Sequence, residues 1–262
     1  RQMCIRDRAE AGRLRGIHAL HLALVADVAG RNRDAERYAR MALAESPDRS
    51  LRLLQLAGGI LARNGAEAEG LRLLEGLGRG MTDYALAAGT PAGRQALIAG
   101  RGVASPAEGI AEAQLALAAA LRGQGAGEAG LILARLSLRL RPNFAPTLLL
   151  VAEHYAEGRN PETAYALLAG VPTDDPLARV VALRQAALLN RMDRVAEAEA
   201  ALRAVAAALP DAPQPYARLG DIFRTRSRFP ESATAYDSAL ARIATPQASD
   251  WTLFYARGIA NE

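Results

Sequence analysis

The chain contains no lysine and one cysteine, Cys4, and aromatic residues make up only 5% of its 262 residues. A single cysteine cannot form a disulfide within the chain, so the composition does not imply an oxidising compartment. Strands favour β-branched and aromatic side chains, whereas Ala and Leu dominate the hydrophobic half of this sequence and have high helix propensities. The composition therefore predicts an all-α chain with enough apolar residues to fold.

Long hydrophobic runs and a strong excess of one charge are absent as well. No apolar run approaches the roughly 18–20 residues that a membrane-spanning helix needs, so we expect no span in this sequence. The 32 basic residues, all arginine, are nearly balanced by 28 acidic residues that alternate with them. Without a basic run or interleaved aromatic residues, we expect no nucleic-acid partner. Abundant Arg and Ala without Lys are typical of a high-GC bacterial gene, and a periplasmic or a cytoplasmic location stays open.

The two ends of the sequence differ from its middle. Residues 3–8, MCIRDR, resemble the translated end of a transposon used in preparing sequencing libraries, so we treat residues 1–8 as an artefact. Removing their three arginines and one aspartate lowers the net charge from +4 to +2. At the other end, residues 247–262 begin a helical pattern that predicts a truncated first helix. We therefore expect the chain to be a fragment of a longer protein.

A period of 34 residues organises the region 111–246. It predicts four contiguous repeats, at 111–144, 145–178, 179–212 and 213–246. Four columns of similar residues carry the period. They are a small column (Ala118, Ala152, Ala186, Gly220), a large apolar column (Leu121, Tyr155, Leu189, Phe223), a second small column (Gly130, Ala164, Ala198, Ser232) and a mostly large column (Ala134, Leu168, Leu202, Tyr236). Prolines 142, 176 and 210 close three of the repeats.

The columns have a physical interpretation as paired helices. A small residue lets two helices approach closely, and a large residue three positions later lies on the same helical face and fills the groove between them. This spacing resembles the tetratricopeptide repeat (TPR) family, whose 34-residue unit is a helix–turn–helix. The resemblance implies an all-α, right-handed superhelical solenoid of antiparallel helix pairs.

The N-terminal part fits this frame less well. We interpret residues 9–83 as two divergent TPR repeats, and residues 84–110 as an irregular linker or a degraded repeat with several glycine and proline breakers. Regular helix is predicted to resume at residues 105–108, SPAE, which supply an N-cap serine, a proline and a glutamate three residues after the cap. Residues 103–106 and 251–258 resemble TPR proteins of alphaproteobacteria, which are longer chains that usually carry an export signal.

Motifs for catalysis or cofactor binding are weak. Residues 125–130, GAGEAG, match a bare dinucleotide fingerprint, but they follow an Ala/Leu-rich helix and are better explained as an inter-helix turn. His18 and His21 are spaced for a shared helix face, but no acidic partner accompanies them, so we predict no metal site. Residues 224–228, RTRSR, form either a solvated turn or an anion site. No nucleophile motif is present, so we predict no enzyme activity and no cofactor.

The TPR resemblance also implies where a partner binds, because the first helices of TPR repeats line a concave surface. Arg184 and Arg218 fall in the same column of adjacent repeats, where two guanidinium groups could pair with carboxylates. In the repeat 145–178, Glu153 and Glu157 occupy this surface instead, so the charge of the groove changes sign along its length. The prediction is an extended peptide or protein segment that is acidic where it meets the last two repeats; the alternative is that these charges only confer solubility. The candidate residues are Arg184, Asn190, Arg191, Arg218, Asp221 and Arg224.

The sequence thus predicts a non-catalytic protein–protein interaction scaffold that binds a peptide or protein segment in the groove of a TPR array. Two alternatives stay open. The chain could be the TPR region of a larger multidomain enzyme, such as a glycosyltransferase, or it could be an envelope-assembly factor.

Overall fold

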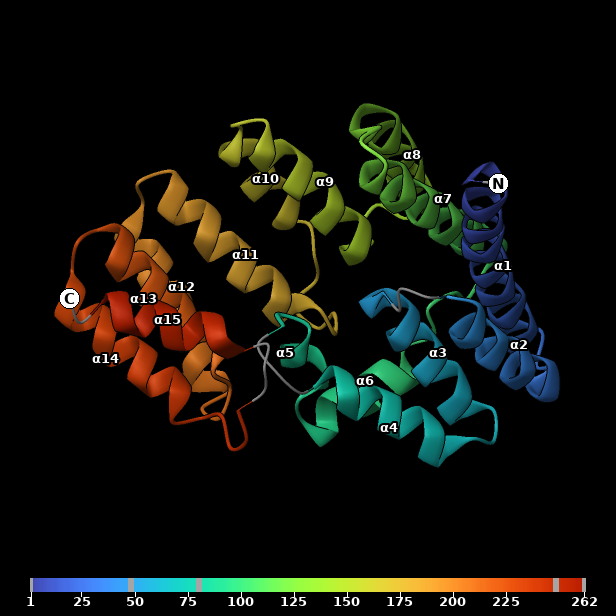
Figure 1. Cartoon of the computed structure of the whole chain (residues 1–262), viewed down its shortest axis with the longest axis horizontal. Coiled ribbons are helices and arrows are strands. Elements are labelled where there is room, and N and C mark those ends of the chain that lie inside the picture. Colours follow the sequence, from blue (N-terminus) through green and yellow to red (C-terminus); the bar gives the residue numbers. More distant parts are fainter. Residues whose placement is uncertain (1, 47–49, 79–81, 247–249, 261–262) are drawn as a thin grey trace. The chain divides into compact units, whose positions relative to one another are not determined.

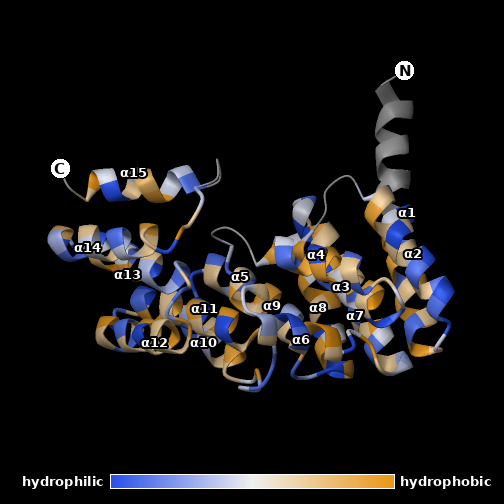
Figure 2. Ribbon diagram, turned by 90° about the horizontal axis from the view of Figure 1, so that it is seen from below, coloured by the Kyte–Doolittle hydropathy of each residue, from blue (hydrophilic) through white to orange (hydrophobic). Residues whose placement is uncertain are grey.

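The computed structural model describes residues 2–46, 50–78, 82–246 and 250–260, and within these ranges the regular structure is entirely helical (Figure 1). Hydrophobic and hydrophilic residues alternate along the helices, as in amphipathic helices that bury one face (Figure 2). Contacts divide the chain into two compact lobes. Lobe 1 comprises Arg1–Leu77 and Thr90–Pro142, and lobe 2 comprises Gly78–Gly89 and Asn143–Glu262.

Lobe 1 contains three helix pairs and one shorter helix. Pairs form between α1 and α2, between α3 and α4, and between α7 and α8, while α6 packs against α3 and α4. The helices are α1 (Gln2–Val28), α2 (Asn32–Glu45), α3 (Leu51–Arg63), α4 (Glu67–Leu77), α6 (Pro91–Ala99), α7 (Pro106–Gly123) and α8 (Gly127–Leu140).

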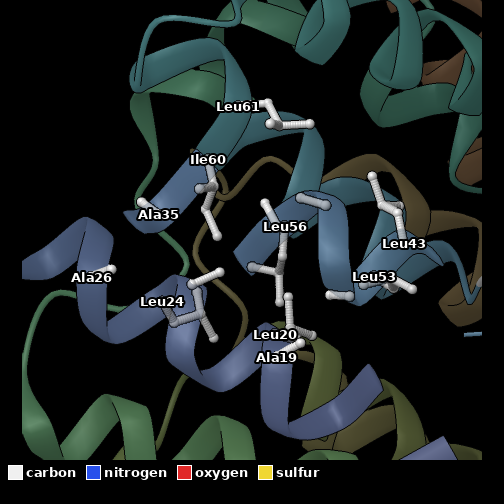
Figure 3. Close-up of a cluster of buried hydrophobic side chains, with 14 of the residues drawn as sticks. Ala19, Leu20, Leu24, Ala26, Ala35, Leu43, Leu53, Leu56, Ile60 and Leu61 are labelled. Atoms are coloured by element: carbon white, nitrogen blue, oxygen red, sulfur yellow. The ribbon is translucent and has the colours of Figure 1, made fainter. Parts of the chain in front are cut away.

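The core of lobe 1 is built from alanine and branched aliphatic side chains. Leu24 of α1, Ala35 of α2, and Leu56 and Ile60 of α3 are buried in one cluster (Figure 3). Small alanine side chains let the helix axes approach, and the leucines fill the space between them. The low aromatic content of the sequence is therefore compatible with a dry core, because close helix packing replaces bulky rings.

Lobe 2 contains three helix pairs followed by a single helix. Pairs form between α9 and α10, between α11 and α12, and between α13 and α14, and α15 packs against α14 (Figures 1 and 2). A one-turn helix, α5, packs against α11. The helices are α5 (Ala85–Ala88), α9 (Ala145–Glu157), α10 (Pro161–Leu168), α11 (Ala178–Arg191), α12 (Val195–Ala208), α13 (Gln214–Thr225), α14 (Phe229–Leu240) and α15 (Trp251–Ile259).

The 34-residue period is visible in the backbone. Gly125, Arg159, Asp193 and Ser227 each lie in the left-handed region, with φ of 82°, 60°, 63° and 57°, at intervals of 34 residues. The second helix of each repeat begins two residues later, at positions 127, 161, 195 and 229. A left-handed residue after a helix reverses the chain direction, and glycine adopts it most readily. The turn of each predicted repeat is therefore the same structure.

The small-residue columns lie where the paired helices touch. A Cβ atom added at Gly130 would lie 2.7 Å from the Ala118 carbonyl oxygen, so only glycine fits there. In the last repeat, the Ser232 hydroxyl donates a hydrogen bond to the Gly220 carbonyl oxygen (2.9 Å). Positions 8 and 20 of the repeat thus face each other, which confirms the 34-residue frame of antiparallel helix pairs.

The region predicted as irregular, residues 84–110, contains α5, α6 and the start of α7. Thr90 caps α6 and Ser105 caps α7, each by accepting a hydrogen bond from a backbone amide three residues later. The predicted start of regular helix at residues 105–108 is confirmed. The division of this region between the lobes, with α5 in lobe 2 and α6 in lobe 1, has no counterpart in the sequence pattern.

Helix α15 falls in the segment 247–262, predicted as the first helix of a further repeat. Leu253 is buried in one cluster with residues of α13 and α14. Trp251, Phe254 and Tyr255 are exposed.

Candidate protein-binding surface on α11 and α13

Helices α11 and α13 are the first helices of two successive repeats, and they lie in contact in lobe 2. Arg184 on α11 and Arg218 on α13 occupy the same repeat column, so their side chains leave neighbouring helices at equivalent heights. Both are about half exposed, with 50% and 41% of the side-chain surface accessible. The two repeats thus stack as predicted, and their stacking brings the guanidinium groups of Arg184 and Arg218 close together.

Both arginines converge on a single carboxylate, that of Asp83. The Arg218 Nη2 atom donates a hydrogen bond to Asp83 Oδ1 (3.0 Å), and the Arg184 Nη2 atom forms an ion pair with Asp83 Oδ2 (3.0 Å). The Asp83 side chain is only 5% exposed. A nearly buried carboxylate needs a compensating charge, and here each oxygen faces its own arginine.

Asp83 belongs to a short segment, residues 82–88, that lies on this surface. The Gln214 side chain donates a hydrogen bond to the Thr82 carbonyl oxygen (3.4 Å), and α5 packs against α11. The four residues of α5, Ala85–Ala88, are all buried. Part of the surface predicted to bind a partner, around Arg184 and Arg218, is therefore in contact with a segment of the chain itself.

A second part of the surface extends from Arg218 towards the end of α13. Arg218 also pairs with Asp221 (3.5 Å), whose Oδ1 atom accepts a hydrogen bond from the Tyr236 hydroxyl (2.8 Å). Arg224 Nε in turn donates to the Tyr236 oxygen (3.3 Å). Four of the six candidate residues, Arg184, Arg218, Asp221 and Arg224, thus belong to one chain of polar contacts that includes Asp83 and Tyr236.

Burial and charge shift the pKa values of this chain. Burial, reinforced by the negative charge of Asp221, raises the pKa of Tyr236 to about 12, so its hydroxyl stays protonated and can donate. Burial on its own would lower the pKa of Arg218, but the charges of Asp83 and Asp221 outweigh it and the net direction is upward. The site therefore presents fixed positive charges rather than a group that titrates near neutrality.

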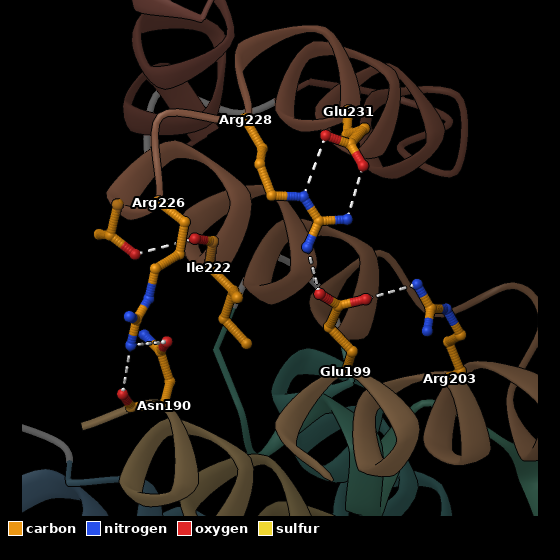
Figure 4. A network of polar contacts seen from close by, with 8 residues as sticks. Asn190, Glu199, Arg203, Ile222, Arg226, Arg228 and Glu231 are labelled. Carbon is orange, nitrogen blue, oxygen red and sulfur yellow. Dashed lines mark hydrogen bonds and ion pairs between the residues drawn. The ribbon is translucent and has the colours of Figure 1, made fainter. Parts of the chain in front are cut away.

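The remaining two candidates, Asn190 and Arg191, lie at the end of α11 and bind neighbouring repeats. Arg191 Nη2 donates to the Ala156 carbonyl oxygen at the end of α9 (2.6 Å). The Asn190 carbonyl oxygen accepts from Arg226 Nη2 (3.0 Å), which also approaches its side-chain oxygen (Figure 4). An arginine at the carboxyl end of a helix satisfies free carbonyl groups and complements the helix dipole. These two residues therefore stabilise the stacking of the repeats.

Similarity to solved structures identifies the fold. No protein-family model matches the sequence, and no curated protein matches it. Among solved structures, the chain is similar to PilW, described as a widely conserved type IV pilus biogenesis factor. The two share 14% identity with a TM-score of 0.50, and the match covers 80% of this chain and 85% of PilW. The chain has the tetratricopeptide-repeat fold.

Other TPR structures are similar at lower scores. MamA of AMB-1 shares 17% identity with a TM-score of 0.41, covering 72% of this chain and 95% of MamA. The TPR2AB domain of yeast Sti1, solved in complex with pHSP90, shares 13% identity with a TM-score of 0.40, covering 97% of this chain and 98% of that chain.

The arginine-rich turn of the last TPR repeat is occupied by ion pairs. Glu199, buried on α12, lies between Arg203 (2.7 Å) and Arg228 (Figure 4). Arg228 also pairs with Glu231 and stacks over a phenylalanine ring, and Arg226 pairs with Asp193. Residues 224–228 are therefore largely engaged in contacts between TPR repeats, which favours a structural role over an anion site.

The structure also shows where the other sequence motifs lie. Residues 125–130 form the turn and first residues of α8, as predicted. Burial lowers the pKa of His21, which lies on α1. Among the described residues, no group of three or more His, Cys, Asp or Glu side chains could hold a metal ion. None of the helices in the described ranges has both the length and the apolarity for a membrane span.

Asp83 is not among the candidate residues predicted from the sequence. It is the last residue of the part interpreted as two divergent repeats, and it precedes a stretch rich in alanine. A single acidic residue beside a breaker-rich region carries no periodic signal, because its partner Arg218 is 135 residues away in the chain. The only sequence signal that pointed to an acidic partner was the column of Arg184 and Arg218, because two adjacent arginines favour a nearby carboxylate.

Proposed function

We propose that this chain is a non-catalytic scaffold that binds a segment of another protein on the α11–α13 surface, with an acidic side chain of the segment between Arg184 and Arg218. The observation that supports this proposal is the Asp83 carboxylate, held by both guanidinium groups at 3.0 Å. That contact gives the chemistry of a suitable ligand: a carboxylate on a segment short and narrow enough to lie across two adjacent helices.

Charge sets selectivity at this surface more than it sets affinity. Because both arginines are about half exposed, each pair contributes at most about 1 kcal/mol, since solvent screens exposed ion pairs. Arranged charges favour an acidic segment over a basic one and accelerate encounter. Burial of apolar side chains of the ligand must supply the rest of the affinity. We therefore expect ligands that combine an Asp or Glu with small or aliphatic residues.

The test is a selection of peptides followed by measured affinities. Random peptides displayed on phage are selected on the immobilised full chain, and the enriched sequences are labelled and titrated by fluorescence anisotropy. The affinities for the wild-type chain are compared with those for Arg184→Glu/Arg218→Glu. We expect enrichment of Asp and Glu, and a loss of at least about tenfold in affinity, corresponding to 1.4 kcal/mol.

A matched control separates this surface from general charge. Arg194→Glu/Arg257→Glu removes the same number of positive charges, at exposed pairs with Glu197 and Asp237 elsewhere in lobe 2. It should leave the affinities unchanged. The milder pair Arg184→Gln/Arg218→Gln is made in parallel, and circular dichroism confirms that each variant is folded. Equal affinities for the wild-type chain and both Arg184/Arg218 variants would show that the proposal is wrong.

A further inference from the structure

The segment 82–88 resembles a bound ligand more than a part of the repeat array. It belongs to lobe 2, although the helices on both sides of it in the chain, α4 and α6, belong to lobe 1. Its contacts with lobe 2 are the features expected of a docked peptide: one carboxylate between two arginines, one backbone carbonyl bound by Gln214, and a short apolar stretch against α11.

The helix in this segment depends on docking. Four residues are far too few for a stable isolated helix, because nucleation fixes several residues before a hydrogen bond compensates for them. At the two ends of α5, the Gly89 amide donates to the Ala85 carbonyl oxygen (2.7 Å), and the Ala85 amide donates to that of Thr82 (3.0 Å). These two bonds should therefore persist only while the segment is on the surface. The segment therefore has two states: in one it is docked and helical, and in the other it is released and unfolded.

We infer that residues 82–88 form a resident ligand, which occupies the α11–α13 surface through Asp83 and must be displaced before an acidic segment of a partner can bind there. This inference rests on the proposed function of the surface. A tethered segment competes at a high effective concentration, in the millimolar range for short flexible connections. The apparent affinity of a partner is then reduced by the fraction of molecules whose surface is free.

The composition of the segment is suited to exchange. Three of the four residues of α5 are alanines, and Leu86 is the one large apolar residue of this helix. The two arginines that hold Asp83 are about half exposed and remain accessible to solvent. Mostly small apolar side chains combined with a specific charge contact allow a partner to replace the segment, particularly when the partner offers the same carboxylate and a larger apolar residue.

The direct test uses the chain's own segment as the probe. A fluorescein-labelled peptide of residues 82–89, TDYALAAG, is titrated against the full chain and against its Asp83→Ala variant. The variant should bind the peptide at least about tenfold more tightly, because its surface is no longer occupied by a competing carboxylate. The same peptide with Ala in place of its Asp should bind neither chain. Adding Arg184→Glu/Arg218→Glu to the Asp83→Ala chain should abolish binding.

Two further variants control for folding and for charge. Asp83→Asn keeps the side-chain shape and serves if Asp83→Ala is unfolded by circular dichroism. Asp237→Ala removes an exposed carboxylate that pairs with Arg257 on α15, and it should behave as the wild-type chain. Equal binding of the peptide by the wild-type and Asp83 variants, or binding by neither, overturns the inference.

A second measurement needs no variant. Hydrogen exchange of residues 85–89 is followed in the wild-type chain with and without an excess of an acidic peptide selected as described above. Displacement should accelerate exchange in this segment, whereas exchange in α12 stays unchanged. Peptide binding with unaltered exchange in residues 85–89 would make the segment a fixed part of lobe 2 and overturn the inference. The proposed function would survive that result, since it fails only if selected peptides ignore Arg184 and Arg218.

Discussion

Gly220 faces the ring of Tyr236 so closely that a Cβ atom at Gly220 would lie 2.5 Å from Tyr236 Cε1. The two residues occupy positions 8 and 24 of the last repeat, on α13 and α14. Their contact joins the first small column (Ala118, Ala152, Ala186, Gly220) to the mostly large column (Ala134, Leu168, Leu202, Tyr236). Tyr236 is 1% exposed, and protein interiors are close-packed, so an added atom at Gly220 must displace its neighbours.

Substitution of Gly220 should therefore destabilise lobe 2. Gly220→Ala gains up to about 1 kcal/mol in helix propensity but should cost about 1–3 kcal/mol through overpacking. Gly220→Trp should unfold the last repeats altogether. Urea denaturation followed by circular dichroism measures the free energy of unfolding. The matched control is Gly123→Ala in α7, where an added Cβ meets no atom within 4 Å. Unchanged stability of Gly220→Trp would mean that the repeat frame is misplaced.

The contact between Gly220 and Tyr236 shows which parts of the structure follow from local sequence. Both residues lie in one 34-residue repeat, and the same size pattern recurs at Ala186 with Leu202 and at Ala152 with Leu168. Periodicity alone therefore predicts the helix pairs, the turns at positions such as Asp193 and the small-residue contacts. These features require only short-range spacing, which a single sequence contains in full.

The contact between Asp83 and the arginine column could not be predicted in the same way. The column of Arg184 and Arg218 is periodic and was recognisable, but Asp83 lies outside the four regular repeats of residues 111–246. Its contact with Arg218 joins two residues that are 135 apart in the chain, and such a contact is a property of tertiary structure. The contacts of Asn190 and Arg191 with neighbouring repeats were not predicted for a similar reason, because a surface arginine looks the same in sequence whichever acceptor it binds.

A buried ion pair in lobe 1 provides a second prediction. Asp27 on α1 accepts hydrogen bonds from Arg63 Nη2 (2.8 Å) and Asn64 Nδ2 (2.6 Å), and its side chain is 4% exposed. Arg63 also donates to the Ile98 carbonyl oxygen at the end of α6 (2.6 Å). Asp27→Ala leaves the Arg63 charge without its partner, which should cost about 3–5 kcal/mol.

Thermal unfolding followed by circular dichroism tests this prediction against an exposed pair. Asp34→Ala removes a surface contact with Arg37 and should change the stability by less than about 1 kcal/mol. Equal melting temperatures for the two variants would contradict a structural role of Asp27 in joining α1, α3 and α6.

The raised pKa of Tyr236 predicts a loss of stability at alkaline pH. The pKa is about 12 in the folded chain and about 10 in the unfolded chain, so the unfolded state releases its proton first. The stabilising contribution is complete below pH 10 and is lost as the pH rises towards 12 and beyond it. The absence of lysine makes this measurable, since tyrosines dominate the titration in that range.

The decisive comparison is between Tyr236→Phe and Tyr255→Phe. Tyr236→Phe should cost about 1 kcal/mol at pH 8, because the hydrogen bonds with Asp221 and Arg224 are lost. It should also flatten the decline in stability between about pH 10 and about pH 12, which are the pKa values of the tyrosine in the unfolded and the folded chain. Tyr255 is 64% exposed, so its substitution should leave both the stability and its pH dependence as in the wild-type chain. Urea denaturation at a series of pH values measures both quantities. If Tyr236→Phe declines as steeply as the wild-type chain, the phenol does not titrate with folding, and burial at this position has a smaller effect than the geometry implies.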